Sequence, residues 1–329
     1  MGAKQSKYHR STRQNSLRRK SVNTTSANNS ANTSSNTTAS VTIDGRQYHN
    51  ESSTYILPKD EIEQDRLNSQ HFALKAVFDG KNILDSIHSS LPKNATVLDL
   101  GCGTGCWVLE MAVEYPEFKF IGLDMADMFP TTIRPENVKF QLHNILHGLP
   151  FQDNTFDFVN MRIMLTAFLI DEWPFVIKEI YRVLKPGGFV ELMESKFPED
   201  DQVLIVKTVN QQFYDILKEN NKDPCISTKL GTMLQQQNFN LIETQERSLQ
   251  YIMTEQPLSS LAREMLGNWK LAVLALKPLL ANKLVDDEEE YESLIDDYVE
   301  GLLEEGWEPR MLAYAAQKPL SQEPSTAKE

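Results

Sequence analysis

Hydrophobic and polar positions between residues 97 and 194 alternate in the manner of strand and helix. Apolar runs at 97–100, 118–123, 138–142, 156–159 and 189–194 predict five strands. Helical spacing of apolar side chains at 108–112 and 173–183 predicts helices between them. Short strands that alternate with helices favour a parallel sheet covered by helices on both faces. We therefore expect an α/β, doubly wound domain.

The same patterns extend the domain on both sides. Residues 203–218 and 230–237 predict helices, and 239–243 with 249–252 predict a sixth strand and its continuation. Helical patterns at 258–276 and 286–305 precede a closing strand at 310–316, so residues 253–307 form an expected helical insertion before the last strand. Asp60, with Glu63 three residues later, predicts the start of a helix that covers the sheet.

Both chain ends lack the apolar side chains that a core needs. Residues 1–47 are rich in Ser, Thr and Asn and are expected to be a disordered tail. A single domain then spans residues 48–318, with a core at 92–195 and helical or cap elements at 48–90 and 253–307. Residues 319–329 are expected to form a flexible C-terminal tail.

A glycine-rich turn after the first of these strands is the main candidate for a binding site. Asp99 is followed by Gly101, Gly103 and Gly105, which permit a positive φ and a close approach of ligand to backbone. The spacing does not give the G-x-G-x-x-G fingerprint of dinucleotide binding, which disfavours a dehydrogenase. Asp124 ends the next strand, 19 residues after Gly105, where an acid can accept hydrogen bonds from ribose hydroxyls or cap the next turn.

Several motifs together resemble the class I S-adenosylmethionine (SAM)-dependent methyltransferases. They are D-x-G-x-G-x-G at 99–105, L-P-F-x-D-x-x-F-D at 149–157 and L-K-P-G-G at 184–188. The string Y-x-L-P-x-D-E-x-E-x-x-R-L-x-x-Q-H at 55–71 is similar to the entry segment of the fungal LaeA-like methyltransferases, members of which are linked to regulation of secondary metabolism. The resemblance implies a mostly parallel, seven-stranded, Rossmann-like sheet whose seventh strand is antiparallel and lies beside the fifth.

The resemblance also implies SAM as the cofactor. We expect the methionine end of SAM at the glycine loop, the ribose at Asp124 and the adenine against Met125. Asn144 stands where the family commonly has Asp, and its carbonyl can still accept from the adenine amino group. The predicted cofactor-binding residues are Asp99, Gly101, Cys102, Gly103, Gly105, Asp124, Met125, Asn144, Ile145, Asn160, Tyr55 and Arg66.

The predicted function is methyl transfer from SAM to a small-molecule or protein acceptor (EC 2.1.1.-). The alternative is a methyltransferase-like regulatory protein that binds SAM with little or no turnover. His71, His143, Arg162 and Glu194 are expected near the rim of the site, but no pair has diagnostic spacing, so no catalytic residue is predicted. Cys102, Cys106 and Cys225 give neither a disulfide framework nor metal-ligand spacing, and no metal is expected.

Charge is divided unevenly along the chain. Seven of the 33 Lys and Arg residues lie in residues 1–40, which contain no acid, so the remainder has 26 basic residues against 46 acids and a net charge of −20. Such a body should repel a phosphate backbone. Absence of the [DN]-P-P-[YF] motif at residue 160 also speaks against methylation of nucleobase amines. We therefore expect no nucleic-acid partner.

The N-terminus matches the pattern for N-myristoylation, with Gly2 after the initiator Met and Ser6 at the sixth position. One myristoyl chain binds membranes only marginally, and the seven basic residues behind it can supply the second attraction. These features predict a cytoplasmic protein with peripheral membrane contact. Arg18, Arg19 and Lys20 leave nuclear localisation as the alternative.

Overall fold

A seven-stranded sheet forms the centre of the protein. The computed structural model describes residues 40–49, 55–198, 201–248 and 258–320. The strands of this sheet are β3 (Thr96–Leu100), β4 (Lys119–Asp124), β5 (Val138–Leu142), β6 (Phe156–Arg162), β7 (Leu184–Lys196), β8 (Asn240–Ser248) and β9 (Arg310–Gln317). Their order is β5-β4-β3-β6-β7-β9-β8. The pairs from β5 to β7 are parallel, and β9 runs antiparallel between β7 and β8, which confirms the predicted fold class.

Helices cover both faces of the sheet because alternate strand residues bury apolar side chains on opposite sides. Val97 and Phe158 pack in one core cluster with α3 (Cys106–Glu114), α2 (Asp85–His88) and part of α1 (Glu61–Val77). Leu98 and Val159 pack in the other with α4 (Trp173–Val183) and α6 (Ile226–Gln236). The predicted helix at 173–183 is thus confirmed, and the predicted strand at 138–142 has the observed ends. The other predicted elements within the described residues differ from the observed ones at their ends, and the predicted strand continuation at 249–252 lies outside the described residues.

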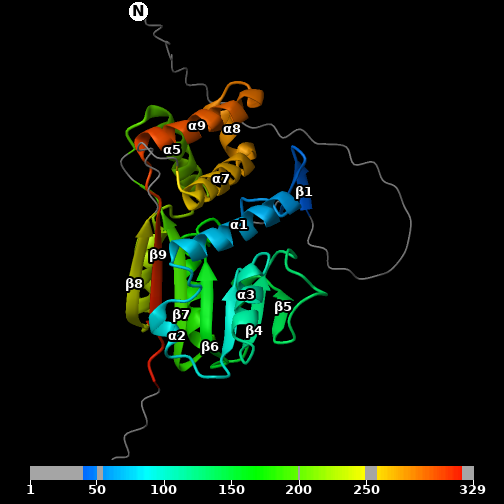
Figure 1. Ribbon diagram of the computed structural model, residues 1–329, viewed down its shortest axis with the longest axis vertical. Coiled ribbons are helices and arrows are strands. Elements are labelled where there is room, and N and C mark those ends of the chain that lie inside the picture. Colours follow the sequence, from blue (N-terminus) through cyan, green and yellow to red (C-terminus); the bar gives the residue numbers. More distant parts are fainter. Residues whose placement is uncertain (1–39, 50–54, 199–200, 249–257, 321–329) are drawn as a thin grey trace, which may run out of the picture. The chain divides into compact units, whose positions relative to one another are not determined.

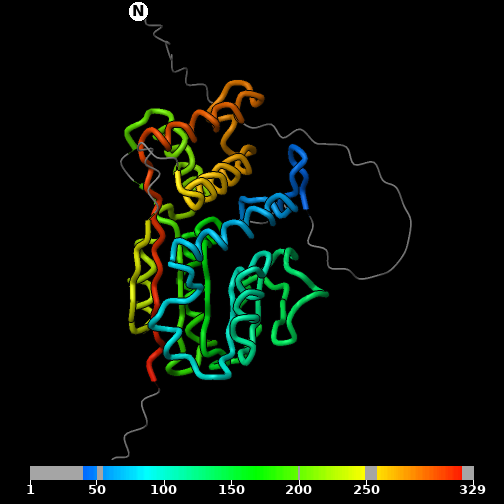
Figure 2. The backbone as a smooth tube through the Cα atoms, viewed as in Figure 1, coloured from blue at the N-terminus to red at the C-terminus, as the bar shows by residue number. Residues whose placement is uncertain are grey.

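The insertion before the last strand lies beyond the carboxyl ends of the parallel strands. Its helices are α7 (Ser260–Ala275), α8 (Lys277–Leu284) and α9 (Tyr291–Glu305), preceded by the short 3₁₀ helix η2 (Glu288–Glu290). α8 and α9 pack on α5 (Leu204–Glu219), and α7 packs on α1, which crosses between the insertion and the sheet (Figure 1). Figure 2 shows the chain leaving β8, passing through these helices and re-entering the sheet as β9.

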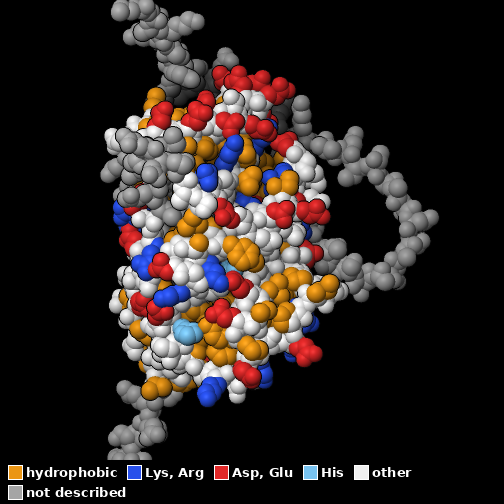
Figure 3. Space-filling model, viewed as in Figure 1, with side chains coloured by type: hydrophobic (Ala, Val, Ile, Leu, Met, Phe, Trp, Pro, Cys, Tyr) orange, Lys and Arg blue, Asp and Glu red, His pale blue; other side chains and the backbone are white. Residues whose placement is uncertain are grey.

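The prediction of two helices in the insertion, at 258–276 and 286–305, was incomplete, because α8 lies between them and the first acids of the second form η2. Leu276 separates α7 from α8, and Pro278 lies in the first turn of α8, where the missing N–H of proline is tolerated. The acids at 286–290 are exposed, and acidic side chains gather over this end of the insertion (Figure 3). None of the described helices is both long and apolar enough to cross a membrane.

A β-hairpin precedes α1 and corrects the predicted domain boundary. Residues 40–47 were expected to belong to a disordered tail, but β1 (Ser40–Ile43) pairs with β2 (Arg46–His49). Asp44 and Gly45 both have positive φ, as the two central residues of a tight hairpin turn require. The Tyr48 hydroxyl donates to the carbonyl of Ala275 at the end of α7, so the hairpin belongs to the domain. The predictions for residues 1–39 and 321–329 lie outside the described residues.

Asp60 forms the predicted N-cap of α1, because its Oδ1 accepts from the N–H of Glu63. Asp60 also pairs with Arg46 of β2, with 2.6 Å between Nε and Oδ2, which ties the hairpin to the helix.

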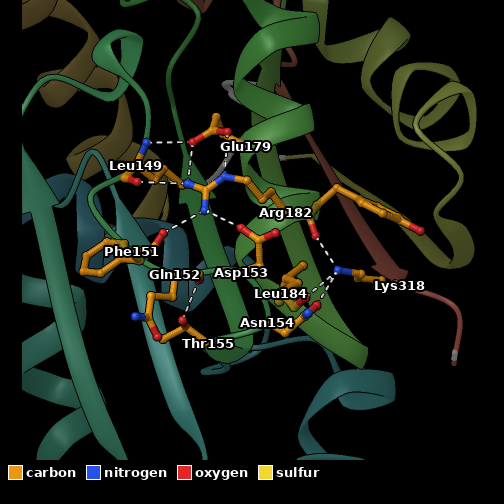
Figure 4. Close-up of polar contacts among 11 residues, drawn as sticks. Leu149, Phe151, Gln152, Asp153, Asn154, Thr155, Glu179, Arg182, Leu184 and Lys318 are labelled. Carbon is orange, nitrogen blue, oxygen red and sulfur yellow. Dashed lines mark hydrogen bonds and ion pairs between the residues drawn. The ribbon is translucent and has the colours of Figure 1, made fainter.

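The L-P-F-x-D-x-x-F-D motif has a structural role at the amino-terminal end of β6, away from the carboxyl ends of the strands. Arg182, at the end of α4, donates to the carbonyls of Leu149 and Phe151 and to the carboxylate of Asp153 (Figure 4). Glu179 accepts from Arg182 and from the N–H of Leu149. These contacts fix the turn that leads into β6.

Candidate functional site

A cavity of about 530 Å³ lies at the carboxyl ends of the parallel strands. This volume is within the range of roughly 300–1,000 Å³ typical of small-molecule sites. Its walls come from the glycine loop, the ends of β4, β6 and β7, and helices α1, α5 and α7. Ligands of open α/β sheets bind at this edge. The position and size therefore make it the candidate functional site.

The glycine loop keeps its backbone open to the cavity. The N–H groups of Gly101 and Cys102 donate to the carbonyl of Leu123 at 2.8 and 3.1 Å, which folds the loop against β4. Gly101 has a φ of 70°, and a Cβ there would lie 2.5 Å from Sδ of Met164. A side chain at this position would thus enter the space between the loop and the segment after β6.

Asp124 holds the loop from the end of β4. Its Oδ2 accepts from the N–H of Gly103 and its Oδ1 from the N–H of Ala126, both at 2.8 Å. Burial raises the pKa of Asp124, and these backbone donors oppose the rise. Asp124 therefore does cap the turn that follows β4, the role that the sequence analysis gave as the alternative to ribose binding. Each carboxylate oxygen has a second lone pair, so Asp124 can also accept from hydroxyl groups of a ligand in the cavity.

Asp99 is a buried acid at the end of β3 that reaches the same cavity. Asn160 of β6 donates to its Oδ1 at 2.7 Å. Burial raises the pKa of Asp99 to about 7, although Arg162 and the Asn160 hydrogen bond lower it. Near neutral pH this carboxyl is poised between its two protonation states, and a cationic ligand next to it would favour the charged form.

Arg162, at the end of β6, is held in place by a chain of polar contacts. It donates from Nη2 to Nδ1 of His71 at 3.1 Å, and Nε2 of His71 lies 2.6 Å from Oε2 of Glu110. Because Nδ1 accepts, the proton of His71 is on Nε2 and is donated to Glu110. Burial and Arg162 lower the pKa of His71 to about 4, so the ring stays neutral. Trp107 lies under the guanidinium, 5.9 Å from its ring centroid.

The predicted adenine contacts also line the cavity. Met125, Asn144 and Ile145 follow the ends of β4 and β5. Oδ1 of Asn144 accepts from the N–H of Leu146 at 2.9 Å and caps the 3₁₀ helix η1 (Ile145–His147). One carbonyl lone pair of Asn144 is therefore used within the chain, and its second remains for a ligand.

Tyr55 and Arg66 reach the cavity from the N-terminal elements. Burial raises the pKa of Tyr55, which keeps its hydroxyl protonated. Arg66 of α1 makes a bidentate pair with Glu63 and donates to Oδ1 of Asn268 on α7. The charge of Arg66 is thus already paired within the chain, and its main role is to join α1 to α7.

Two predicted cofactor residues are not among those that line the cavity, and we correct them. Gly105 is the N-cap of α3 with a φ of 76°, and it packs against Phe140 rather than facing the ligand space. Asn160 is fully buried between strands and acts through Asp99. The other ten predicted residues line the cavity.

One part of the cavity was not predicted from the sequence. Phe197, Phe213, Trp269 and Trp307 form an aromatic wall, and Glu194 lies beside it at the end of β7. The four expected rim residues His71, His143, Arg162 and Glu194 all line the cavity. Within the described ranges, no group of three or more His, Cys, Asp or Glu side chains is arranged to bind a metal.

Comparisons with known proteins agree with this geometry. Residues 97–188 match the methyltransferase domain family. The chain is 32% identical over 204 residues to the secondary metabolism regulator laeA of Aspergillus fumigatus, which covers 60% of this chain and 51% of that protein. It is 31% identical over 178 residues to the protein-methionine methyltransferase laeA of Emericella nidulans, covering 53% and 46%. The chain thus spans about half the length of these relatives.

Among solved structures, the [4+2]-cyclase SpnF superposes with a TM-score of 0.46 at 18% identity, over 79% of this chain and 96% of that one.

Residues 97–188 are thus similar to a methyltransferase domain, and the chain resembles the laeA proteins over about half of their length. The match agrees with the predicted SAM cofactor.

Proposed function

We propose that the protein binds SAM in this cavity and transfers its methyl group to a small-molecule or protein acceptor that enters the same cavity. The observation that carries the proposal is the division of the cavity wall. The glycine loop, Asp99 and Asp124 form one part, and an aromatic wall with Glu194 forms another. A single cavity with two chemically different parts suits two ligands that must meet.

The chain's own residues fit the cofactor. Gly101 and Gly103 have no side chains, so the methionine end of SAM can lie against the backbone. A Cβ at Gly101 would fill this space and collide with Met164. Asp99 offers a carboxylate to a cation, and Asp124 offers lone pairs to ribose hydroxyls. SAM supplies a methyl group on a sulfonium, whose sulfur becomes neutral when the methyl leaves. The protein can therefore catalyse transfer largely by holding the acceptor in line with that methyl.

Two classes of acceptor, a protein side chain and a small molecule, are each supported by a separate observation. The relative from Emericella nidulans is named a protein-methionine methyltransferase, which supports a protein side chain. The size of the cavity, about 530 Å³, supports a small molecule, because it is within the range of small-molecule sites. The Aspergillus fumigatus relative is named a secondary metabolism regulator, which supports the alternative of a regulatory protein that binds SAM with little turnover.

SAM affinity should depend on pH through Asp99. The carboxyl of Asp99 has a pKa of about 7 in the free protein, and a bound cation favours its ionised form. Below pH 7, binding therefore has to release the Asp99 proton, and affinity should fall about fivefold from pH 7 to pH 6. Calorimetry in buffers of different ionisation enthalpy measures both the affinity and the released proton.

Two variants sharpen this test. Asp99→Asn should bind SAM more weakly and release no proton from this position. Glu191→Gln is the matched control, because Glu191 also has a pKa raised to about 7 by burial but faces Leu84 instead of the cavity. An affinity of the unmodified protein that does not change between pH 5.5 and 7 would contradict the placement of SAM beside Asp99.

We further propose that the N-terminus acts as a reversible membrane anchor, which rests on Gly2, Ser6 and the basic residues behind them. Myristoylated protein should float with liposomes that contain anionic lipid and should stay in solution with neutral liposomes. The variant Gly2→Ala should lose this association. Equal flotation of the variant and the unmodified protein would show that the anchor is absent.

A further inference from the structure

The aromatic part of the cavity is built from elements far apart in the chain. Trp269 of α7 lies at the centre of this group, with ring centroids 5.2 Å from Phe197, 5.7 Å from Phe213 and 5.9 Å from Trp307. The indole N–H of Trp269 donates to the Tyr298 hydroxyl at 2.9 Å, so its polar atom is satisfied within the protein. The faces that remain for a ligand are apolar and flat, which suits an aromatic molecule.

Glu194 is the acid at this wall. It lies on β7, three residues before Phe197, and is 2% exposed. Its Oε1 accepts from the N–H of Met164, in the segment after β6. Its Oε2 has no hydrogen-bond partner among the described residues. A buried polar atom without a partner is costly, and a ligand group that hydrogen-bonds to it would recover that free energy.

We propose that this part of the cavity is the acceptor site, that it takes a small aromatic molecule with a phenol-type hydroxyl, and that Glu194 is the general base. The proposal rests on the proposed methyltransferase function. In the reaction, the hydroxyl oxygen forms a bond to the methyl carbon while the carbon–sulfur bond breaks and its electron pair stays on sulfur. The hydroxyl proton passes to Oε2 of Glu194. Atoms and charge balance without a further reactant.

The environment of Glu194 suits this role. Burial raises its pKa to about 8, and the backbone N–H groups of Met164, Ser195 and Leu165 act in the opposite direction. Across the sheet it pairs with the apolar Leu312 of β9. The other titratable groups on the cavity wall are His49, Tyr55, Arg66, His71, Asp99, Cys102, Cys106, Asp124, His143, Arg162 and Glu172. The pKa of Glu194 is close to that of a phenol, which is about 10, and much lower than that of an aliphatic alcohol, so a phenol is the hydroxyl that Glu194 can deprotonate.

Binding to the protein loaded with S-adenosylhomocysteine tests the site without turnover. We expect calorimetry to show that 2-naphthol binds at least tenfold more tightly than 2-naphthalenesulfonate. The two share a ring system, but the sulfonate carries a permanent charge that the aromatic wall cannot solvate. If S-adenosylhomocysteine binds but 2-naphthol does not, the acceptor proposal is wrong while the cofactor site stands. If S-adenosylhomocysteine itself does not bind, the proposed function fails and this proposal with it.

Transfer from methyl-labelled SAM to 2-naphthol tests Glu194. With saturating SAM, so that the pH dependence of SAM binding through Asp99 does not enter, the rate with the unmodified protein should rise with pH and reach half of its maximum near pH 8, because only the ionised carboxylate accepts a proton. Glu194→Gln should lose about 10²–10⁴-fold of the rate and the pH dependence with it. Glu191→Gln, on the opposite face of the same strand, should keep both.

Two results would overturn the role of Glu194. One is a Glu194→Gln variant that keeps the rate and the pH profile. The other is a rate for the unmodified protein that does not change between pH 6 and 8, a measurement that requires no variant to fold.

Discussion

Arg66→Ala is expected to lower the free energy of unfolding by about 3–5 kcal/mol, the cost of leaving a buried charge without its partner. The Arg66 side chain is 4% exposed and that of Glu63 is 1% exposed. Truncation removes both hydrogen bonds to Glu63 and the one to Asn268 of α7. Glu63 would remain buried and charged beside an empty space. Urea unfolding followed by circular dichroism measures the loss.

The matched control is Arg310→Ala. Arg310 pairs with Glu246 and Glu308, but its side chain is 45% exposed, so water replaces the lost contacts. We therefore expect a much smaller change than for Arg66→Ala, since solvent screens the exposed pairs of Arg310. Adding Glu63→Gln to Arg66→Ala should restore part of the loss by removing the unpaired charge. If Arg66→Ala costs no more than Arg310→Ala, the join between α1 and α7 does not depend on this pair.

Gly105→Ala is expected to cost about 2–5 kcal/mol. A φ of 76° strains a residue that has a Cβ, at about 1–2 kcal/mol, and overpacking adds about 1–3 kcal/mol. The new Cβ would lie 2.5 Å from Cζ of Phe140, whose ring is stacked on Phe129 at 5.0 Å. Thermal and urea unfolding measure the loss, and calorimetry should show weaker SAM binding because the loop before α3 has to move.

Gly267→Ala provides the comparison for the same chemical change. Gly267 lies in α7, has no positive φ, and a Cβ there would have nothing within 4 Å. Alanine should stabilise the helix by about 0.5–1 kcal/mol. Equal effects of the two substitutions would show that the loop tolerates a side chain at residue 105.

The sequence was sufficient for the sheet because its strands are short apolar runs bounded by turn residues. The strand at 138–142 has the predicted ends, and the closing strand lies beside β7 as the resemblance implied. The hairpin at 40–49 was missed because the Ser-, Thr- and Asn-rich composition of residues 1–47 predicted a disordered tail. Asp44-Gly45 is a turn signal that could have revealed it.

The site was only partly predictable, because its walls come from distant segments. Asn268 and Arg66 are 202 residues apart in the chain, and no local pattern joins them. Glu191 and Glu194 lie on one strand and look equivalent in the sequence. The side-chain alternation of β7 turns Glu194 toward the cavity and Glu191 toward Leu84, a difference that depends on the register of the strand. The aromatic wall was missed because the sequence does not show which helix face packs on which neighbouring element.

Transfer of label from methyl-labelled SAM is the most direct test of the proposed function. The purified protein is incubated with the labelled SAM and an extract of its source cells, with Asp124→Ala as the control that lacks the acid holding the glycine loop. We predict that S-adenosylhomocysteine forms and that label enters an acceptor only with the unmodified protein. Binding of SAM with no label transferred above the Asp124→Ala control would contradict methyl transfer and would favour the regulatory alternative.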